Sequence, residues 1–476
     1  MDHCAMTGRR KGVLDRSPGD VTSRRAEHDA RVAGLRRQLA EVPADAAVRL
    51  AKRTSNLFRS RSQAKTPGLD VSGFTHVLEV DPETGIAEVE GMVTYEKLVD
   101  ATLEYGFMPL VVPQLKTITL GGAVTGLGIE SSSFRNGLPH ESVLEMELLT
   151  GDGRVVVARP DNEHSDLFYG FPNSYGTLGY ALRLRIQLEP VKKFVQLTHV
   201  RHRDPREYFE DMGRMCHTRS HGGKAVDFVD GTVFGPDEMY LTVGTFVDEA
   251  PAVSDYTWLD IYYRSIQRLE VDHLTIRDYL WRWDTDWFWC SRAFGVQNKF
   301  ARLFLGRRLL RSEVYWKVVA FDRKHKVAAK IERMRGNPPE ETIVQDIEVP
   351  LDRAVEFLDF FQREIPISPV WVCPVQQRPQ GVTWPLYELD PDALYVNFGF
   401  WSAVPLEPGE SDGTHNRMIE ATVSELGGRK SLYSESFYQE DDFWQRYNGK
   451  AYHALKDRYD EKHRLLDLYD KCVRGR

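Results

Sequence analysis

The sequence predicts an α+β protein built from more than one domain. Its 476 residues exceed what a single ordinary hydrophobic core organises. Segments in which apolar and polar residues alternate, as in strands, are interspersed with segments in which apolar residues recur at helical spacing. Hydrophobic residues make up 42% and charged residues 28%, which is the balance of a globular protein rather than a disordered or fibrous one.

The first elements can be assigned from composition and period. Residues 1–24 contain few large apolar side chains, so we expect a loose tail, and residues 27–39 have the apolar spacing of a short amphipathic helix. Residues 69–81 and 86–93 both alternate apolar with polar side chains, and Pro82-Glu-Thr-Gly85 between them supplies turn residues. This pattern predicts a β-hairpin.

The next elements continue the mixture of helix and strand. Residues 95–105 predict a helix ended by Gly106, and residues 108–113 predict a short strand interrupted by proline. Residues 143–157 predict a second hairpin around a Gly-Asp-Gly turn, and residues 180–191 predict a further pair of strands. Beyond this point the periodic segments become longer and more polar, so we place a domain boundary near residues 190–195.

Charge and cysteine usage exclude several classes of protein. A net charge of -8 argues against a nucleic-acid-binding protein, which needs a basic surface to displace counterions from phosphate. The polar start of the chain is no signal peptide, and no apolar run approaches the length of a membrane span, so we expect a cytoplasmic protein. No zinc site or disulfide scaffold is indicated by the five widely spaced cysteines, Cys4, Cys216, Cys290, Cys373 and Cys472.

The stretch Thr117-Ile-Thr-Leu-Gly-Gly-Ala-Val-Thr-Gly-Leu-Gly-Ile-Glu-Ser-Ser-Ser133 is the most informative motif. Small residues let the main chain approach a ligand closely and adopt positive φ angles, and converging amides can bind a diphosphate without a lysine. The alternative is a tight turn or a closely packed strand pair. The residue order matches neither a Rossmann G-x-G-x-x-G nor a P-loop. The small residues are Gly121, Gly122, Ala123, Gly126 and Gly128, and the hydroxyl donors are Thr119, Thr125, Ser131 and Ser132.

A second turn of small residues, Phe171-Pro-Asn-Ser-Tyr-Gly-Thr-Leu-Gly179, follows Ser165-Asp-Leu-Phe-Tyr169. Together these strings resemble the FAD-binding domain of the vanillyl-alcohol-oxidase, or p-cresol-methylhydroxylase (PCMH), superfamily. The likeness is closest to its Δ24-sterol reductase (Diminuto/seladin-like) branch and extends over roughly residues 45–476. It is carried by G-L-G-I-E-S-S-S (126–133), N-G-L-P-H-E (136–141), S-D-L-F-Y (165–169), G-T-L-G (176–179), P-V-K-K-F-V (190–195), W-V-C-P (371–374) and F-W-Q-R-Y-N-G-K-A-Y-H (443–453).

The resemblance implies a division of the chain. After a polar tail and short helix (1–44), two α+β subdomains would hold an extended FAD (45–192), an α+β substrate or cap domain would follow (193–426), and a C-terminal segment (427–476) would pack back onto the FAD domain. The resemblance also implies the residues along the cofactor, which are Thr119, Gly121, Gly122, Ala123, Gly126, Gly128, Ile129, Ser131, Ser132, Thr177, Gly179 and Ile186.

Two departures from the superfamily matter. Where many members have an R-G-G-G-x-S turn, this chain reads Lys52-Arg-Thr-Ser-Asn-Leu-Phe-Arg59. No histidine stands there, so we expect a non-covalent FAD. Eukaryotic sterol reductases of this branch carry a hydrophobic anchor before the flavin domain, and here only a polar tail precedes it. We therefore expect a cytoplasmic protein, free or peripheral on the inner face of the membrane.

The implied reaction is reduction of a C=C bond of a lipid, with NADPH or NADH as the electron donor. The substrate would be a 10-methylene fatty acyl lipid, reduced to the 10-methyl form as related flavoproteins do, or a Δ24-sterol-type alkene. A methyltransferase or other lipid-modifying enzyme would be a partner in the first case. The alternatives are an FAD-dependent alcohol or sugar oxidase or dehydrogenase, and a non-catalytic flavoprotein partner of another enzyme.

Alkene reduction needs a hydride from the flavin and a proton from a nearby acid. The resemblance places a basic residue beside the flavin pyrimidine, so Lys430 would stabilise the anionic reduced flavin, and Tyr433 or Tyr438 would supply the proton. The alternative is that Lys430 is solvated and both tyrosines are packing residues. No metal site is predicted, because His140 and His164 lack metal-ligand spacing.

Residues 281–317 form a tract in which aromatic and leucine residues alternate with cations. Between Arg292 and Lys317 seven basic residues accompany one acid. This composition is typical of segments that lie at a membrane surface, with rings at headgroup depth and cations on lipid phosphates. A buried aromatic cluster under a solvated basic face explains it equally well.

Overall fold

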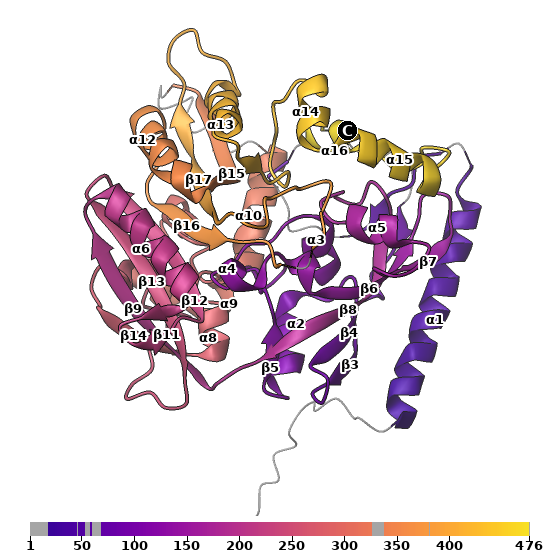
Figure 1. The fold of residues 1–476 in the computed structure, drawn as a ribbon, viewed down its shortest axis with the longest axis horizontal. Helices are drawn as coiled ribbons and strands as arrows, with labels where there is room; N and C mark the ends of the chain where they lie inside the picture. Colours follow the sequence, from indigo (N-terminus) through magenta and orange to yellow (C-terminus); the bar gives the residue numbers. More distant parts are fainter. Residues whose placement is uncertain are drawn as a thin grey trace, which may run out of the picture.

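The computed structural model describes residues 18–44, 46–52, 58–59, 68–325, 338–379 and 381–475. It contains two large antiparallel sheets with helices around them, so the predicted α+β class is confirmed (Figure 1). The polar Lys52–Arg59 turn lies mostly outside the described residues, and only its first and its last two positions are placed.

The first sheet has six strands in the order β3-β4-β8-β6-β7, with β5 paired to β8, and all its pairings are antiparallel. Both predicted hairpins are present, as β3–β4 and β6–β7. The strands are β3 (Val77–Asp81), β4 (Ile86–Glu90), β5 (Phe107–Pro109), β6 (Val143–Leu149), β7 (Val155–Ala158) and β8 (Tyr180–Pro190). The helices within this part are α2 (Tyr95–Leu103), α3 (Leu120–Thr125), α4 (Ser133–Asn136), the 3-10 helix η1 (Pro139–Ser142) and α5 (Ser165–Gly170).

Two sequence predictions are corrected here. Residues 180–191 form one long strand, β8, rather than two, because β8 lies in the middle of the sheet and pairs with both β4 and β6. The helix predicted from residue 27 is α1 (Pro18–Glu41), which begins inside the segment predicted to be a loose tail. Its first turns are polar and are held by ion pairs rather than by apolar burial.

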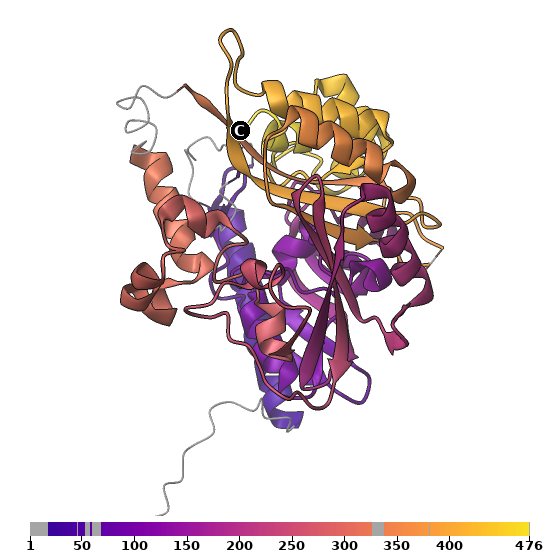
Figure 2. The same ribbon diagram turned by 90° about the vertical axis from the view of Figure 1, so that its left-hand side faces the viewer.

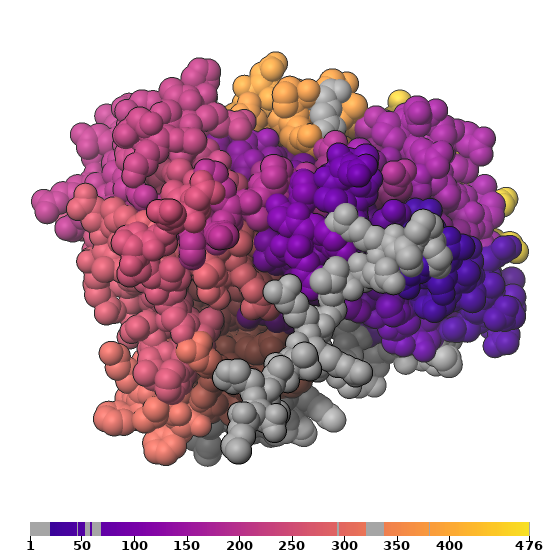
Figure 3. Space-filling model, turned by 90° about the horizontal axis from the view of Figure 1, so that it is seen from below, coloured from indigo at the N-terminus to yellow at the C-terminus, as the bar shows by residue number. Residues whose placement is uncertain are grey.

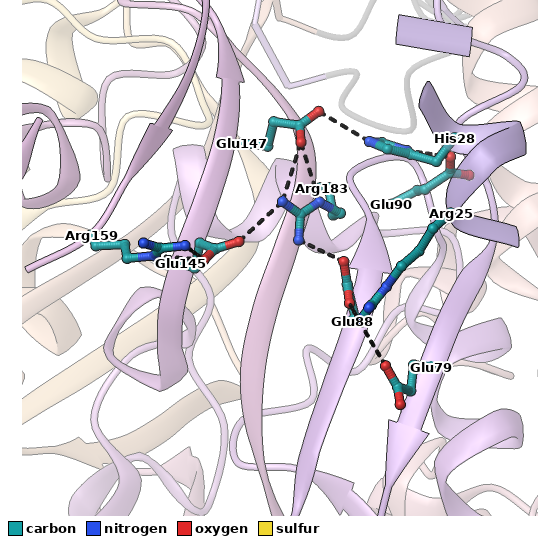
Figure 4. A network of polar contacts seen from close by, with 9 residues as sticks. All are labelled: Arg25, His28, Glu79, Glu88, Glu90, Glu145, Glu147, Arg159 and Arg183. Atoms are coloured by element: carbon teal, nitrogen blue, oxygen red, sulfur yellow. Dashed lines mark hydrogen bonds and ion pairs between the residues drawn. The ribbon is translucent and has the colours of Figure 1, made fainter. Parts of the chain in front are cut away.

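Helix α1 is tied to the first sheet by the polar network drawn in Figure 4. The ring of His28 contacts Glu90 through Nδ1 at 2.8 Å and Glu147 through Nε2 at 3.0 Å. Arg183 on β8 pairs with Glu147 at 3.2 Å, and Arg25 pairs with Glu88 at 2.5 Å. Charged side chains from one helix and three strands therefore interlock between helix and sheet.

The second sheet has eight strands in the order β14-β9-β13-β12-β16-β17-β15-β18, all antiparallel. Its bounds are β9 (Phe194–His202), β12 (Phe228–Gly235), β13 (Glu238–Val247), β14 (Val271–Thr275), β15 (Glu340–Pro350), β16 (Val370–Val375), β17 (Tyr395–Pro405) and β18 (Arg429–Lys430). Strand β9 begins immediately after β8 ends, so the chain passes from one sheet to the other at residues 190–194.

Three helices cover one face of this sheet and share a core with it, namely α6 (Pro205–Thr218), α12 (Ala354–Glu364) and α13 (Thr414–Glu425). Figure 2 shows α9 (Lys299–Leu309) and α10 (Ser312–His325), in salmon, on the opposite side of the strands from α6. The other short helices of this part are α7 (Tyr262–Ser265), α8 (Ile276–Leu280), η2 (Cys290–Phe294) and η3 (Leu351–Arg353). Two separate strand pairs are β1 (Leu50–Ala51) with β2 (Leu69–Asp70) and β10 (Ser220–His221) with β11 (Lys224–Ala225).

Strand alternation sets what each face of the second sheet carries. On β15, Ile343 and Ile347 belong to the core under α6, α12 and α13, whereas Asp346 lines a cavity on the other side. Because successive side chains of a strand point to opposite faces, the cavity face of β17 receives Trp401 and that of β16 receives Trp371.

The end of the chain first joins the second sheet as β18 and then forms α14 (Glu440–Arg446), α15 (Gly449–Tyr459) and α16 (Leu468–Cys472). Lys456 of α15 donates to the carbonyl oxygen of Thr177 at 2.8 Å, and Lys471 of α16 donates to that of Tyr175 at 2.5 Å. Figure 1 shows these yellow helices above α5 and α3. The last 30 or so residues thus contact the small-residue turn that precedes β8.

Candidate cofactor cavity and active site

A cavity of about 600 Å³ lies between the two sheets and receives residues from both. The glycine-rich segment and the turn before β8 supply its first wall. Strands β15, β16 and β17 and the segment before η2 supply the second. The cavity therefore brings together parts of the chain that are more than 400 residues apart, from Val48 to Lys471.

Part of the glycine-rich motif is a short helix rather than a turn. Helix α3 begins at Leu120, and the Thr119 hydroxyl oxygen caps it by accepting from the Gly122 amide at 3.2 Å. The Gly121 amide is also used, because it donates to the Gly91 carbonyl oxygen at 2.9 Å. The first turn of α3 therefore has few free donors for a diphosphate.

The glycines are required by close approach and not by positive φ angles, which corrects the sequence prediction. None of Gly121, Gly122, Gly126 and Gly128 has a positive φ. A Cβ on Gly121 would lie 2.7 Å from the Gly91 carbonyl oxygen, and a Cβ on Gly128 would lie 2.9 Å from Pro113 Cγ. Gly121 therefore lets neighbouring main chain pack at the cavity wall, and Gly128 does the same for the ring of Pro113.

The donors available to a phosphate follow α3. Leu127, Gly128 and Ile129 line the cavity in a stretch that is neither helix nor strand, and within the described chain their main-chain amides donate to no protein acceptor. Gln114 also lines the cavity, is 4% exposed, and has no partner in the described residues for either atom of its side-chain amide. Buried polar groups are nearly always hydrogen-bonded, so these atoms fit a bound polar ligand.

The cavity therefore suits FAD. A diphosphate would be held by the amides of Leu127 to Ile129, and Gln114 can both donate to and accept from a polar ring edge. The remaining wall is largely apolar, which suits a flat heteroaromatic ring. None of the cavity-lining residues that the structure describes is a histidine, so they offer no histidyl anchor for the flavin.

Eight of the twelve predicted cofactor residues line the cavity, namely Thr119, Gly121, Gly122, Ala123, Gly126, Gly128, Ile129 and Gly179. The other four do not. Ser131 is bonded to Glu130 and Tyr279, and Ser132 donates to the Leu110 carbonyl oxygen at 2.8 Å. Thr177 Oγ1 donates to the Ser174 carbonyl oxygen at 2.7 Å, and Ile186 is a core residue of the first sheet. The side chains of these four residues are hydrogen-bonded or packed within the protein and do not line the cavity.

Glu130, at the end of the motif, joins the two parts of the molecule. Its carboxylate accepts from the Ser131 amide at 2.9 Å and from Arg282 Nη2 at 3.0 Å, and the same Arg282 nitrogen donates to Asp230 of β12 at 2.8 Å. Burial raises the pKa of Glu130, and the Arg282 charge opposes that shift. Glu130 therefore holds the second sheet against the cofactor segment.

The second wall of the cavity is aromatic. Phe288 lies 4.3 Å from Trp401 and 5.6 Å from Trp371 between ring centroids, and Trp287 completes the group. Aromatic side chains at this spacing exclude water and pack well on hydrocarbon. This wall can accommodate an apolar substrate beside a flavin.

Tyr433 is the predicted acid that the structure places in the cavity. Its hydroxyl oxygen accepts from Trp401 Nε1 at 2.9 Å, and it also shares a hydrogen bond with Asp346. Burial and then the Asp346 charge raise the pKa of Tyr433 well above its ordinary value, so it is protonated at neutral pH. Burial raises the pKa of Asp346 to about 6.

The other two predicted catalytic residues lie elsewhere. Lys430 is fully buried, and its Nζ is bonded to a Glu420 carboxylate oxygen at 2.5 Å and to the Glu435 carbonyl oxygen at 2.6 Å. On β18 it points away from the cavity, whereas the next residue, Ser431, lines it. Tyr438 packs against Tyr447 at 6.1 Å. Neither residue is placed to act on a flavin in this cavity.

Two residues of the site were missed from sequence. Gln114 follows the predicted strand 108–113, which is interrupted by proline, and it belongs to no recognisable sequence motif. Asp346 could have been found, because Thr342-Ile-Val-Gln-Asp-Ile-Glu-Val349 reads as a buried strand with a carboxylate in its middle. A carboxylate in such a strand needs a partner or a function.

Comparison with known proteins agrees with this site. The sequence profile of the family described as "FAD binding domain" matches residues 41–159. The fold, the cavity and this match define an FAD-dependent oxidoreductase, and residues 41–159 are similar to an FAD-binding domain of the p-cresol-methylhydroxylase type.

The chain is also similar to individual proteins whose names state an enzyme activity. The chain is 28% identical to the Delta(24)-sterol reductase of Homo sapiens over 415 residues, covering 84% of this chain and 76% of the relative. It is 27% identical to the enzyme of the same name from Arabidopsis thaliana over 444 residues, covering 86% and 77%. It is also 28% identical to Cytokinin dehydrogenase 9 of Oryza sativa subsp. japonica over 160 residues, covering 33% and 30%. The resemblance deduced from the motifs is confirmed.

Proposed function

We propose that this protein reduces a C=C bond of a lipid, with FAD as cofactor and NADPH or NADH as electron donor. The observation that carries the proposal is the cavity itself, in which a wall suited to FAD faces an aromatic wall containing one acid pair, Tyr433 and Asp346. The similarity to proteins named Delta(24)-sterol reductase supports the same reaction type.

FAD, when bound, supplies the hydride, and the protein must supply a proton to the other alkene carbon. We assign this step to Tyr433 because it is protonated at neutral pH and lines the cavity. The Trp401 indole fixes the position of its oxygen through a 2.9 Å hydrogen bond. In its protonated form Asp346, which is bonded to the same hydroxyl, returns a proton to Tyr433 after transfer and then regains one from solvent.

The aromatic wall selects the substrate. Trp287, Phe288, Trp371 and Trp401 offer apolar surface and few polar groups, which favours a hydrocarbon chain or ring system over a sugar. A 10-methylene fatty acyl lipid and a Δ24-sterol-type alkene both meet this requirement. For the acyl substrate, the methylene group would come from a methyltransferase-type enzyme acting one step earlier.

We also propose a cytoplasmic protein, peripheral on the inner face of the membrane, which is where such a substrate resides. Among the described residues no helix is both long and apolar enough to cross a bilayer. A lipid substrate would then be reached from the membrane surface.

Anaerobic mixing tests the function. We expect the flavin band to bleach with reduced nicotinamide and to recover on adding an unsaturated lipid. Oxygen is then admitted to the reduced protein. Rapid reoxidation of the flavin by oxygen, with release of hydrogen peroxide, would instead identify an alcohol or sugar oxidase. Reoxidation of the flavin only by an artificial electron acceptor would identify a dehydrogenase. The absence of any redox response would identify a non-catalytic flavoprotein.

Mass spectrometry of lipids from a strain lacking the gene distinguishes the two substrates. Accumulation of a methylene-branched acyl chain would identify the acyl lipid, and accumulation of a side-chain-unsaturated sterol would identify the sterol. An unchanged lipid profile would contradict a lipid substrate altogether.

A further inference from the structure

In the first part of helix α9 a charged side chain is buried and large apolar side chains are exposed. Arg302 is buried and is bonded to Asp286 by Nη1 at 2.6 Å, whereas Phe300 is 74% exposed and Phe304 is 88% exposed. Leu303, beside them, is 53% exposed. Residues three and four apart lie on one helical face, so the three apolar side chains form a single exposed stripe.

Two further exposed apolar side chains lie beyond this stripe, Leu309 at the end of α9 and Val318 on α10. We call the exposed apolar side chains of these two helices the α9 patch, and its members are Phe300, Leu303, Phe304, Leu309 and Val318. In the described chain the other exposed large apolar side chains are Val253, Leu269 and Val271, each less exposed than the two phenylalanines. Figure 3 shows the salmon segment that carries the α9 patch as a projecting corner of the molecule. Surface of this kind marks an interaction site.

Exposed cations lie on the same helix as most of the patch. Lys299 and Arg308 are exposed, and in the described part of the chain no acidic group pairs with either. Arg307, in contrast, pairs with Asp255 at 2.6 Å, and Lys317 pairs with Glu313 at 2.8 Å. Since the whole protein has a net charge of -8, the free cations here are a local feature rather than an overall trend.

The α9 patch is fixed to the wall of the cavity. The Asp286–Arg302 ion pair anchors α9 to the residue preceding Trp287, which lines the cavity. Trp287 also lies parallel to Tyr315 of α10, with ring centroids 6.3 Å apart. A partner seated on the patch therefore lies against a helix that is bonded directly to the segment forming the aromatic wall.

We propose that the α9 patch docks on an anionic lipid bilayer. Phe300, Leu303 and Phe304 insert at headgroup depth, and Lys299 and Arg308 contact lipid phosphates. The substrate then passes from the bilayer to the aromatic wall along residues 286–290, a step that rests on the proposed function, whereas docking itself does not. A bilayer is favoured over a protein partner because exposed apolar rings beside exposed cations match the apolar interior and anionic surface of a membrane.

Co-sedimentation of the full-length, FAD-loaded protein with vesicles tests the docking. The vesicles contain phosphatidylcholine alone or with about one third phosphatidylglycerol, a content high enough to give the membrane a negative surface potential. We expect binding to the anionic vesicles, weakened at least about tenfold in Phe300→Ser/Phe304→Ser. Lys299→Glu/Arg308→Glu should weaken binding to the anionic vesicles only. The matched control, Leu269→Ser/Val271→Ser, removes two exposed apolar side chains at the start of the edge strand β14 and just before it, and should bind as the unchanged protein does.

Two results would overturn the proposal. One is wild-type protein that stays in solution with both vesicle types. The other is a patch that joins two copies of the chain, seen as a dimer by light scattering that Phe300→Ser/Phe304→Ser dissociates, without vesicle binding. Failure of the proposed function looks different, because the protein would bind vesicles while no unsaturated lipid reoxidised its flavin. If both proposals hold, Phe300→Ser/Phe304→Ser slows turnover of lipid in vesicles but not of the same lipid dispersed in detergent.

Discussion

The indole Nε1 of Trp401 donates a hydrogen bond to the hydroxyl oxygen of Tyr433 at 2.9 Å. Trp401 comes from β17 and Tyr433 from the chain just after β18, so the contact exists only when the second sheet is complete. Because indole only donates, the hydroxyl proton of Tyr433 stays available to Asp346 or to a substrate. The hydrogen bond therefore orients the acid without consuming its proton.

Replacing Tyr433 by phenylalanine should slow reoxidation of the reduced flavin by an unsaturated lipid roughly 100-fold or more, which is the usual contribution of a general acid. Flavin reduction by NADPH and flavin content should stay close to normal, because only the hydroxyl is removed. Stopped-flow absorbance of the flavin band measures both half-reactions. Tyr438→Phe is the control, since Tyr438 lies outside the cavity, and equal rates in the two variants would remove Tyr433 from the mechanism.

Asp346 should give the lipid half-reaction a pH dependence. Its pKa is raised to about 6, so its carboxyl is protonated below this pH and ionised above it. The ionised carboxylate holds the Tyr433 proton more strongly, so the rate of flavin reoxidation by lipid should fall as pH rises through about 6. In Asp346→Asn this step in the profile should vanish. A step of the same size in the variant would assign the titration to another group.

Gln114 should act on cofactor binding and not on folding. Both atoms of its side-chain amide lack a partner within the described residues, so Gln114→Leu removes no protein hydrogen bond. We expect thermal stability of the FAD-free protein to be unchanged or higher, and FAD affinity to fall about tenfold, as the loss of one or two hydrogen bonds predicts. Isothermal titration of FAD into apoprotein measures the affinity.

The control for this substitution is Asn136→Leu. Asn136 Nδ2 donates to the Leu110 carbonyl oxygen at 2.8 Å and to Glu189 at 2.9 Å, so its loss should lower the melting temperature of the apoprotein. If Gln114→Leu destabilised the apoprotein by as much, Gln114 would be a structural residue.

The sequence predicted the class of fold and the cofactor segment because both depend on local patterns. Alternation marks β3, β4, β6 and β7, and the small residues near Gly121 mark a close approach of main chain. Ser131 and Thr177 were misplaced because a hydroxyl beside a ligand and a hydroxyl closing a turn have the same sequence signature. Lys430 was misplaced because its ion pair with Glu420 depends on the packing of α13 against β18, which no local pattern encodes.

Gly121 should tolerate no side chain. A Cβ there would lie 2.7 Å from the Gly91 carbonyl oxygen, which is main chain and cannot rotate away. Gly121→Ala should lower the free energy of unfolding by about 1–3 kcal/mol and reduce the fraction of FAD retained on purification. Chemical denaturation and the flavin-to-protein absorbance ratio measure these effects. Gly235→Ala is the matched control, because a Cβ there meets nothing within 4 Å, and it should leave both values unchanged.

His28 should make the stability of the protein depend on pH. Burial alone would lower the pKa of His28, but the hydrogen bonds and charges of Glu147 and Glu90 raise it to about 9. The same contacts lower the pKa values of Glu90 and Glu147, against the effect of burial. The ring and both carboxylates are therefore charged together over a wide pH range.

The sign follows from comparing folded and unfolded states. A group whose pKa rises on folding contributes stability that is complete below its unfolded pKa of 6.5 and is lost as pH rises through about 9. The two carboxylates contribute in the opposite sense, above their ordinary pKa of 4.5, and lose the contribution as pH falls. The network around α1 is thus strongest between roughly pH 4.5 and 6.5, and the melting temperature of the unchanged protein should decline from pH 6.5 to 9.

His28→Ala should abolish that decline and lower the stability near pH 6 by about 3 kcal/mol, because the buried Glu90 carboxylate and the partly buried Glu147 carboxylate each lose one of their charged partners. Calorimetric melting between pH 5 and 9.5 measures both effects. His463→Ala is the control, since the side chain of His463 is 61% exposed and lies 3.7 Å from Asp457, a pair that water and salt screen. If His28→Ala kept the alkaline decline, the titrating group would be one other than His28, and α1 would be held on the sheet by the arginine pairs alone.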